Sequence, residues 1–378
     1  MHIFVALAGL ALLFVVLWDA FETVILPRRV MREYRLARLC FRSTWLLWRA
    51  IARKVSSKKV QQSFLSYYGP LSLLLLFGMW AAALILAFGM LQWAAGASAG
   101  GPGAGATFRS DVYLSGSTFF TLGMGDVTPG TTLARVVAVF EAGTGFGVLA
   151  IVISYLPTMF GAFSQREVNI SLLDARAGSP PTAGELLRRH GRQRIEDGLG
   201  IYLRDWETWS AQLMESHLTY PFLCFFRSQH DNQSWVAAFT AILDVCALLI
   251  AYGDGEVKWQ AQLTFAISRH AVADLSQVLR LQPRESAPNR LTHDDLPKVR
   301  ELLIECGVPG CTDAGDAKLK ELRSMYEPYL DVLSKLLLMP LPSWGAEVAP
   351  SRDTTVWGRI TSEMPGGGSS APADTKHF

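Results

Sequence analysis

The sequence predicts an all-α membrane protein that carries a helical domain outside the membrane. Three apolar runs are each long enough to cross a bilayer, at 3–26, 66–93 and 133–163. From Ser164 onward acidic and basic residues mix, and apolar residues recur at helical spacing. The chain has 378 residues, half of them hydrophobic, and a net charge of +2. This length predicts two or three domains.

Composition divides the chain into five segments. Residues 1–27 are expected to form an N-terminal transmembrane helix, and residues 28–64 a basic interfacial or cytoplasmic segment. Residues 65–163 hold the other two spans and the short loop between them. The helical domain is expected at 164–340. Pro, Gly and Ser dominate 341–378, where we expect a disordered tail.

Two acidic residues, Asp19 and Glu22, lie one helical turn apart near the end of the first span. Acids inside a membrane are costly and usually have partners. These two could pair with Arg28, Arg29 or other basic residues at the interface. Alternatively, they could contact the helices of the segment at 65–163.

The segment after the first span is strongly basic. Residues 28–59 contain eleven Lys or Arg and one acid, Glu33, whereas residues 94–110 contain one charge, Arg109. Basic residues accumulate on the cytoplasmic side of membrane proteins, so we expect a multi-pass protein of the cell membrane with Met1 outside and the C-terminal domain in the cytoplasm. Leucines and tryptophans among the arginines predict an amphipathic helix that contacts membrane lipid, including anionic lipid. A position between two spans argues against nucleic acid as a partner.

Between the second and third spans lies a segment too short to cross the membrane, DVYLSGSTFFTLGMGDVTPG at 111–130. Its first half can form a short helix. In its second half glycine alternates with other residues, and because glycine tolerates positive φ, successive carbonyls can turn toward one line. A ring of such carbonyls can replace the water shell of a cation. The segment resembles the pore loop and selectivity filter of the potassium channel family, whose filter is usually written TVGYG, and the resemblance covers 66–163.

This resemblance implies a pore domain at 65–163 that is built from an outer helix, a re-entrant pore helix with its filter, and an inner helix. It also implies that filter carbonyls and one threonine hydroxyl bind K⁺ as the permeant ion. A single pore loop per chain implies a homotetramer. No organic cofactor is expected. The implied ion-binding residues are Thr121, Leu122, Gly123, Met124, Gly125 and Asp126.

Two positions depart from the family's pattern. Met124 replaces the filter aromatic, and Ser117 stands where some members have an acid that supports the filter. The tyrosine that the family has in place of Met124 bonds the pore helix and braces the filter. A flexible methionine cannot do so. Selectivity for potassium over sodium therefore stays open. A weakly selective channel for monovalent cations is the alternative.

The third span corresponds to the inner helix that lines the cavity in this family. It contains one acid, Glu141, and three glycines, Gly143, Gly145 and Gly147. We expect these four residues to line the pore or to act in gating. A ring of Glu141 carboxylates would raise the local cation concentration, or the side chain could bond a neighbouring pore helix. The glycines favour close helix packing, a gating hinge, or both.

The helical domain at 164–340 shows no signature of a familiar ligand-binding fold. It has no strand followed by Gly-x-Gly-x-x-Gly, and it lacks the strands of a cyclic-nucleotide-binding β-roll. The run at 235–252 is apolar on most sides except Asp244, and we expect a buried helix of a bundle rather than a fourth span. The domain is expected to sense an unknown cytoplasmic ligand. A purely structural role is the alternative.

An alternative from another class is a membrane-anchored, metal-dependent phosphohydrolase. Such enzymes gather His and Asp ligands on one metal ion, and a His-Asp dipeptide is a weak signal of them. We therefore expect no catalytic residue, no metal site and no enzymatic activity. The residues that this alternative would use are His190, the pair His230 and Asp231, and Asp244 or Asp254.

Overall fold

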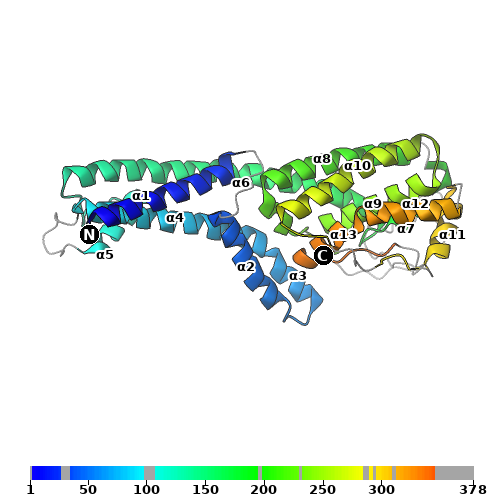
Figure 1. Cartoon of the computed structure of the whole chain (residues 1–378), viewed down its shortest axis with the longest axis horizontal. Coiled ribbons are helices and arrows are strands. Elements are labelled where there is room, and N and C mark those ends of the chain that lie inside the picture. The colour runs from blue at the N-terminus through cyan, green and yellow to red at the C-terminus, as the bar shows by residue number, and fades with distance from the viewer. Residues whose placement is uncertain are drawn as a thin grey trace, which may run out of the picture. The chain divides into compact units, whose positions relative to one another are not determined.

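The computed structural model of the chain describes residues 2–26, 35–97, 107–194, 198–229, 232–283, 289–292, 295–308 and 312–344. Within these ranges every regular element is a helix and none is a strand, which confirms the all-α fold class. The chain divides into two compact units, Met1–Phe163 and Ser164–Phe378. Helix α6 (Thr132–Ala177) begins in the first unit and ends in the second (Figure 1). Most of the expected tail at 341–378 lies outside the described residues.

Four helical stretches of the described chain have the length and apolar composition needed to cross a membrane. Three of them correspond to the expected spans. The fourth differs from these because almost all of its residues are buried inside the second unit. The stretches are His2–Ile25, Lys58–Ala94, Thr132–Ala177 and Trp235–Tyr252.

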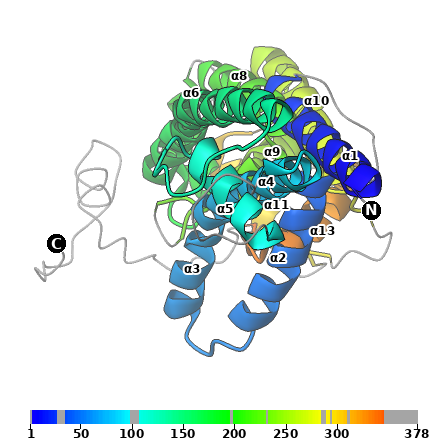
Figure 2. The same cartoon turned by 90° about the vertical axis from the view of Figure 1, so that its left-hand side faces the viewer.

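The first unit is organised around α1 (His2–Ala20) and α4 (Tyr68–Ala94), which lie side by side in both views (Figures 1 and 2). A Cβ on Gly9 would lie 2.9 Å from the Ala87 carbonyl oxygen, so only glycine permits this approach. Near the other end of α1, Asp19 bonds Trp80. Gly9 contacts Ala87, and Asp19, later in α1, contacts Trp80, which comes earlier in α4. The two helices are therefore antiparallel.

Asp19 and Glu22 have different partners, so each of the two sequence alternatives holds for one of them. The Asp19 carboxylate accepts hydrogen bonds from Trp80 Nε1 on α4 and from the backbone nitrogen of Ala37, both at 3.0 Å. Glu22, in the short helix η1 (Phe21–Ile25), pairs with Arg35 at 3.5 Å. Arg28 and Arg29 lie outside the described residues.

The basic segment forms two helices rather than the one expected, α2 (Leu36–Ala52) and α3 (Lys58–Ser66), joined by a short connection (Figure 2). Ser56 and Ser57 stand at the break, and serine favours such positions because its hydroxyl competes for backbone hydrogen bonds. The two helices are held together by Trp48, which stacks on Phe64 with ring centroids 4.4 Å apart. Gln61 also donates to the Ala52 carbonyl at 2.8 Å.

The second unit is a helical bundle around α9 (Trp235–Tyr252), which begins where the Ser234 hydroxyl accepts from the Ala237 nitrogen. Helices α8 (Gly200–Thr219) and α10 (Gly255–Val278) pack closely (Figure 1). The burial of α9 agrees with a bundle helix. The remaining helices of this unit are α7 (Ala183–Arg194), η4 (Pro221–Phe225), α11 (Leu296–Cys306), α12 (Asp313–Ser324) and α13 (Glu327–Leu337).

The bundle ends with two helices, α12 and α13, separated by a short break. Helix α12 stops after Ser324 and α13 starts at Glu327, with Pro328 in its first turn. Proline lacks the backbone N–H that a helix interior needs but is tolerated in a first turn, which explains the break.

Candidate functional site

The short helix of the pore segment, α5 (Phe108–Phe119), begins with a capping box. Thr107 Oγ1 accepts from the Ser110 nitrogen, and Ser110 Oγ accepts from the Thr107 nitrogen, both at 3.3 Å. Along its length α5 lies tightly against α4, since a Cβ on Gly89 would be 2.9 Å from the Val112 side chain. The helix is therefore fixed in direction before the chain enters the candidate filter, residues 121–126, which is called the filter below.

Three backbone hydrogen bonds carry the chain out of α5 and into the filter. The nitrogens of Phe120, Thr121 and Leu122 donate to carbonyls of the last turn of α5, at 3.1, 3.0 and 2.8 Å. Leu122 bonds the carbonyl of Ser117. The C-terminal end of a helix carries a partial negative charge, so this junction favours a cation nearby.

The backbone of the filter alternates in handedness. Thr121, Gly123 and Gly125 have φ of 56°, 59° and 80°, whereas Leu122 and Met124 between them do not have positive φ. This alternation allows successive carbonyls to point the same way, unlike the alternating carbonyls of a β-strand. A β-branched residue at positive φ is an outlier that costs about 1 to 3 kcal/mol and typically marks a functional site. Thr121 is such a residue.

The filter lacks a cover within its own chain. All six residues from Thr121 to Asp126 are exposed, with Leu122 and Met124 at 64% and 69%. Nothing lies within 4 Å of a Cβ built on Gly123 or Gly125. At the outer end of the segment, the Tyr113 hydroxyl of α5 bonds the Asp126 carboxylate.

The chain after the filter is tied back to the end of α4. The Gly130 nitrogen donates to the Ala97 carbonyl at 3.0 Å, and the Thr131 hydroxyl to the Ala95 carbonyl at 2.8 Å. Thr131 Oγ1 also accepts from the Ala134 nitrogen at the start of α6. The filter is thus anchored on both sides, by α5 before it and by α4 and α6 after it.

Glu141 is buried within the chain that the structure describes, against the pore helix. Its side chain is fully buried, and its Oε1 bonds the hydroxyl of Ser115 on α5. It therefore contacts the pore helix, as one of the two sequence alternatives proposed. The sequence did not indicate Ser115 as the partner of Glu141. A serine on a short helix carries no local pattern that points to a residue on another helix.

The three glycines of α6 have different surroundings. A Cβ on Gly145 would lie 2.2 Å from the Phe119 carbonyl oxygen, so this glycine permits close contact between α6 and the end of α5. Gly143 and Gly147 have nothing within 4 Å. Pro157, which no sequence pattern marked, lies inside α6 and removes one backbone hydrogen bond there.

Comparison with known proteins adds an independent observation about this segment. Residues 73–161 match the model of an ion channel family, described as "Ion channel". This segment belongs to that family. The match covers most of α4, all of α5, the filter and the first part of α6. For this segment, the assignment to the potassium channel family made from the sequence is thereby confirmed.

The ion channel segment also lies in a chain with a relative of unassigned activity. The chain is 25% identical over 212 residues to the "Uncharacterized membrane protein YdjJ" of Bacillus subtilis (strain 168). The match covers 54% of this chain, and the chain spans 61% of the relative's length. No solved structure matches. Together the apolar helices, the family and this relative make the chain a multi-pass membrane protein with an ion channel segment.

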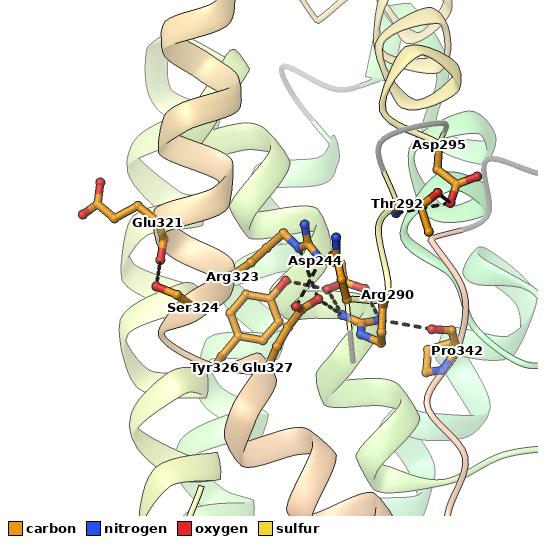
Figure 3. Close-up of polar contacts among 11 residues, drawn as sticks. Asp244, Arg290, Thr292, Asp295, Glu321, Arg323, Ser324, Tyr326, Glu327 and Pro342 are labelled. Carbon is orange, nitrogen blue, oxygen red and sulfur yellow. Dashed lines mark hydrogen bonds and ion pairs between the residues drawn. The ribbon is translucent and has the colours of Figure 1, made fainter. Parts of the chain in front are cut away.

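Outside the ion channel segment, the described residues of the phosphohydrolase alternative have different surroundings. His190 is buried beside Tyr202 and its Nδ1 lies 2.8 Å from the Leu186 carbonyl oxygen. Asp244 bonds Arg290 and Tyr326 (Figure 3). Across the described ranges no three His, Cys, Asp or Glu side chains are placed to hold a metal ion. Two further candidates, His230 and Asp231, lie outside those ranges, and Asp254 is exposed.

Proposed function

We propose that four copies of this chain form a channel that conducts K⁺ passively through the cell membrane. The observation that carries the proposal is the alternating φ of Thr121, Gly123 and Gly125, in a segment that matches an ion channel family. Carbonyls that point the same way can replace the hydration shell of a dehydrated cation. One chain supplies one wall of such a site, so the ring requires further copies.

Exposure of apolar surface supports assembly around the filter. Phe120, Leu122 and Met124 are each more than half exposed in the single chain. Exposed apolar side chains also run along α6. Facing copies, or lipid on the outer side, would cover such surfaces. A single chain in water would leave this apolar surface exposed, which is unfavourable. The exposed residues of α6 in the first unit are Leu133, Val136, Val139, Phe140, Phe146, Leu149, Ile153 and Phe160.

The orientation and partners follow from charge. Met1 lies outside and the second unit is the cytoplasmic part, which senses the unknown gating stimulus. Helix α2 lies on the inner leaflet, because its exposed Leu39, Leu46 and Leu47 stand among arginines that suit anionic lipid. Permeation needs no organic cofactor and no catalytic residue.

A weakly selective monovalent cation channel is the second candidate. The observation that favours it is Met124, which is 69% exposed where the family has an aromatic brace. Without that brace the carbonyl ring can change its width, and strict discrimination between K⁺ and Na⁺ is reduced.

Reconstituted full-length protein tests the proposal through K⁺ efflux from liposomes. The wild type is expected to release K⁺, and Gly123→Ala to lower the rate by about tenfold or more, since alanine at positive φ is strained by about 1 to 2 kcal/mol. Gly78→Ala on α4 is the matched control, because nothing lies within 4 Å of its Cβ. Equal efflux from Gly123→Ala and Gly78→Ala would contradict a filter at this position.

A further inference from the structure

A buried polar cluster joins α4, α5 and α6. Ser115 on α5 lies between two oxygens, the Ile85 carbonyl of α4 at 2.7 Å and Oε1 of Glu141 on α6. Ser115 and Glu141 are both fully buried. The Gln92 amide on α4 also interacts with the Glu141 carboxyl group.

The number of protons in this cluster decides the charge of Glu141. A serine hydroxyl has one hydrogen, and two of its contacts here are to oxygens that ordinarily only accept. The Ile85 carbonyl cannot donate, so it must receive the Ser115 hydrogen. A hydrogen bond between Ser115 Oγ and Glu141 Oε1 then needs a second hydrogen, and only the Glu141 carboxyl group can supply it.

The surroundings of Glu141 agree with a neutral acid. A buried carboxylate in a membrane-spanning helix is costly unless a cation pairs with it. Among the residues that the structure describes, no Lys, Arg or His forms an ion pair with Glu141, and the Gln92 amide beside it is neutral. Arg135, the basic residue of α6 nearest to it in sequence, donates to the Pro129 carbonyl at 3.3 Å.

We infer that Glu141 is protonated and acts as a positioning residue, donating to Ser115 and thereby tying the inner helix to the pore helix and the outer helix. This inference rests on the proposed channel function for its effect on conduction. Removal of the proton would leave Ser115 with one hydrogen for two acceptors and would place a bare carboxylate in the membrane interior. The pore helix would then lose its link to α6, and the filter that follows it would shift.

Other titratable groups lie on the same three helices, so a pH response of Glu141 has to be separated from theirs. Asp111 precedes Ser115 by one turn on the same face of α5 and is also buried. The variant Asp111→Asn therefore accompanies each measurement on Glu141. The titratable groups of the three helices within the first unit are Tyr68 on α4, Arg109, Asp111 and Tyr113 on α5, and Arg135, Glu141 and Tyr155 on α6.

Infrared spectroscopy of full-length protein in liposomes tests the protonation without any current. The spectrum of the wild type minus that of Glu141→Gln at about pH 7 is expected to show the carbonyl stretch of a protonated carboxylic acid. The difference between wild type and Asp111→Asn should lack the same band or show it at another frequency. A carboxylate signature in the Glu141 difference spectrum would overturn the inference.

The pH profile of K⁺ efflux tests the positioning role. Wild-type efflux is expected to fall as the pH rises from about 7 to about 10, whereas Glu141→Gln, whose amide still donates to Ser115, should keep its efflux over this range. Ser115→Ala should lower efflux by about tenfold, as expected for loss of a buried hydrogen bond. Ser154→Ala is the control, since its hydroxyl bonds its own helix at the Ile151 carbonyl.

These results separate the inference from the proposed function. If K⁺ efflux at alkaline pH falls equally in the wild type and in Glu141→Gln, the positioning role is overturned. Absence of efflux from the wild type and from every variant would contradict the channel function, while the infrared result would still decide whether Glu141 carries its proton.

Discussion

Asp244 and Arg290 form a two-point ion pair inside the second unit, with Nη2 to Oδ1 at 2.6 Å and Nη1 to Oδ2 at 3.0 Å (Figure 3). The Tyr326 hydroxyl donates to Asp244 Oδ1 at 2.6 Å, and burial together with the Asp244 carboxylate raises the pKa of Tyr326, so the hydroxyl keeps its proton. Arg290 also pairs with Glu327 at 3.0 Å and donates to the Pro342 carbonyl. The pair joins α9 to α13 and to two connecting segments.

Loss of the Asp244 carboxylate is expected to destabilise the protein strongly. Asp244→Ala leaves Arg290 largely buried without its main partner, and breaking a buried pair costs about 3 to 5 kcal/mol. The thermal midpoint of the full-length protein in detergent should fall accordingly. Glu321→Ala removes an exposed pair with Lys318 and should cost less than about 1 kcal/mol. Similar losses in the two variants would contradict the role assigned to Asp244.

His217 should make the second unit sensitive to acid. It is fully buried with Nε2 3.2 Å from Arg166 Nη1, and burial and then the Arg166 charge hold its pKa well below the usual value. Below about pH 6.5 the His217 imidazole therefore binds a proton in the unfolded chain but not in the folded chain. The free energy of unfolding falls as the pH falls. At about pH 5.5 the loss is about 1.4 kcal/mol.

Thermal unfolding over a pH series checks this dependence. His217→Gln should flatten the acid side of the profile by about that amount. His270→Gln serves as the matched control, because its side chain is 56% exposed whereas that of His217 is buried. An unchanged acid slope in His217→Gln would contradict the assignment.

Gly145 should tolerate no side chain. Gly145→Ala would place a Cβ against the Phe119 carbonyl and force α6 away from α5, at a cost of about 1 to 3 kcal/mol for overpacking. Both thermal stability and K⁺ efflux should fall. Gly147→Ala is the matched control, with open space around its Cβ in the chain. A Gly145→Ala protein as stable and active as Gly147→Ala would contradict the close approach.

Local features of the sequence predicted much of the pore segment. The spans were predictable because apolar length alone marks them, and the filter because glycine alternation reports on backbone conformation. The burial of α9 also depends on residues close together in the sequence. The positive φ of Thr121 could not be predicted, since threonine disfavours that conformation.

Side-chain pairing between distant helices could not be predicted from one sequence. Nothing near Glu141 indicates Ser115 as its partner, and nothing near Asp244 indicates Arg290. Both acids stand out in the sequence because the helices around them are apolar. Their partners depend on which helix faces pack against each other, and that packing has no local pattern in the sequence.

Reversal potentials of the reconstituted protein under a K⁺/Na⁺ gradient test the central claim most directly. A filter of aligned carbonyls from four copies of Thr121 to Gly125 predicts a cation current whose reversal potential lies near the K⁺ equilibrium potential. A reversal potential near zero would contradict potassium selectivity and favour the weakly selective channel. No current at all, from protein shown to be folded and inserted, would contradict a conducting pore.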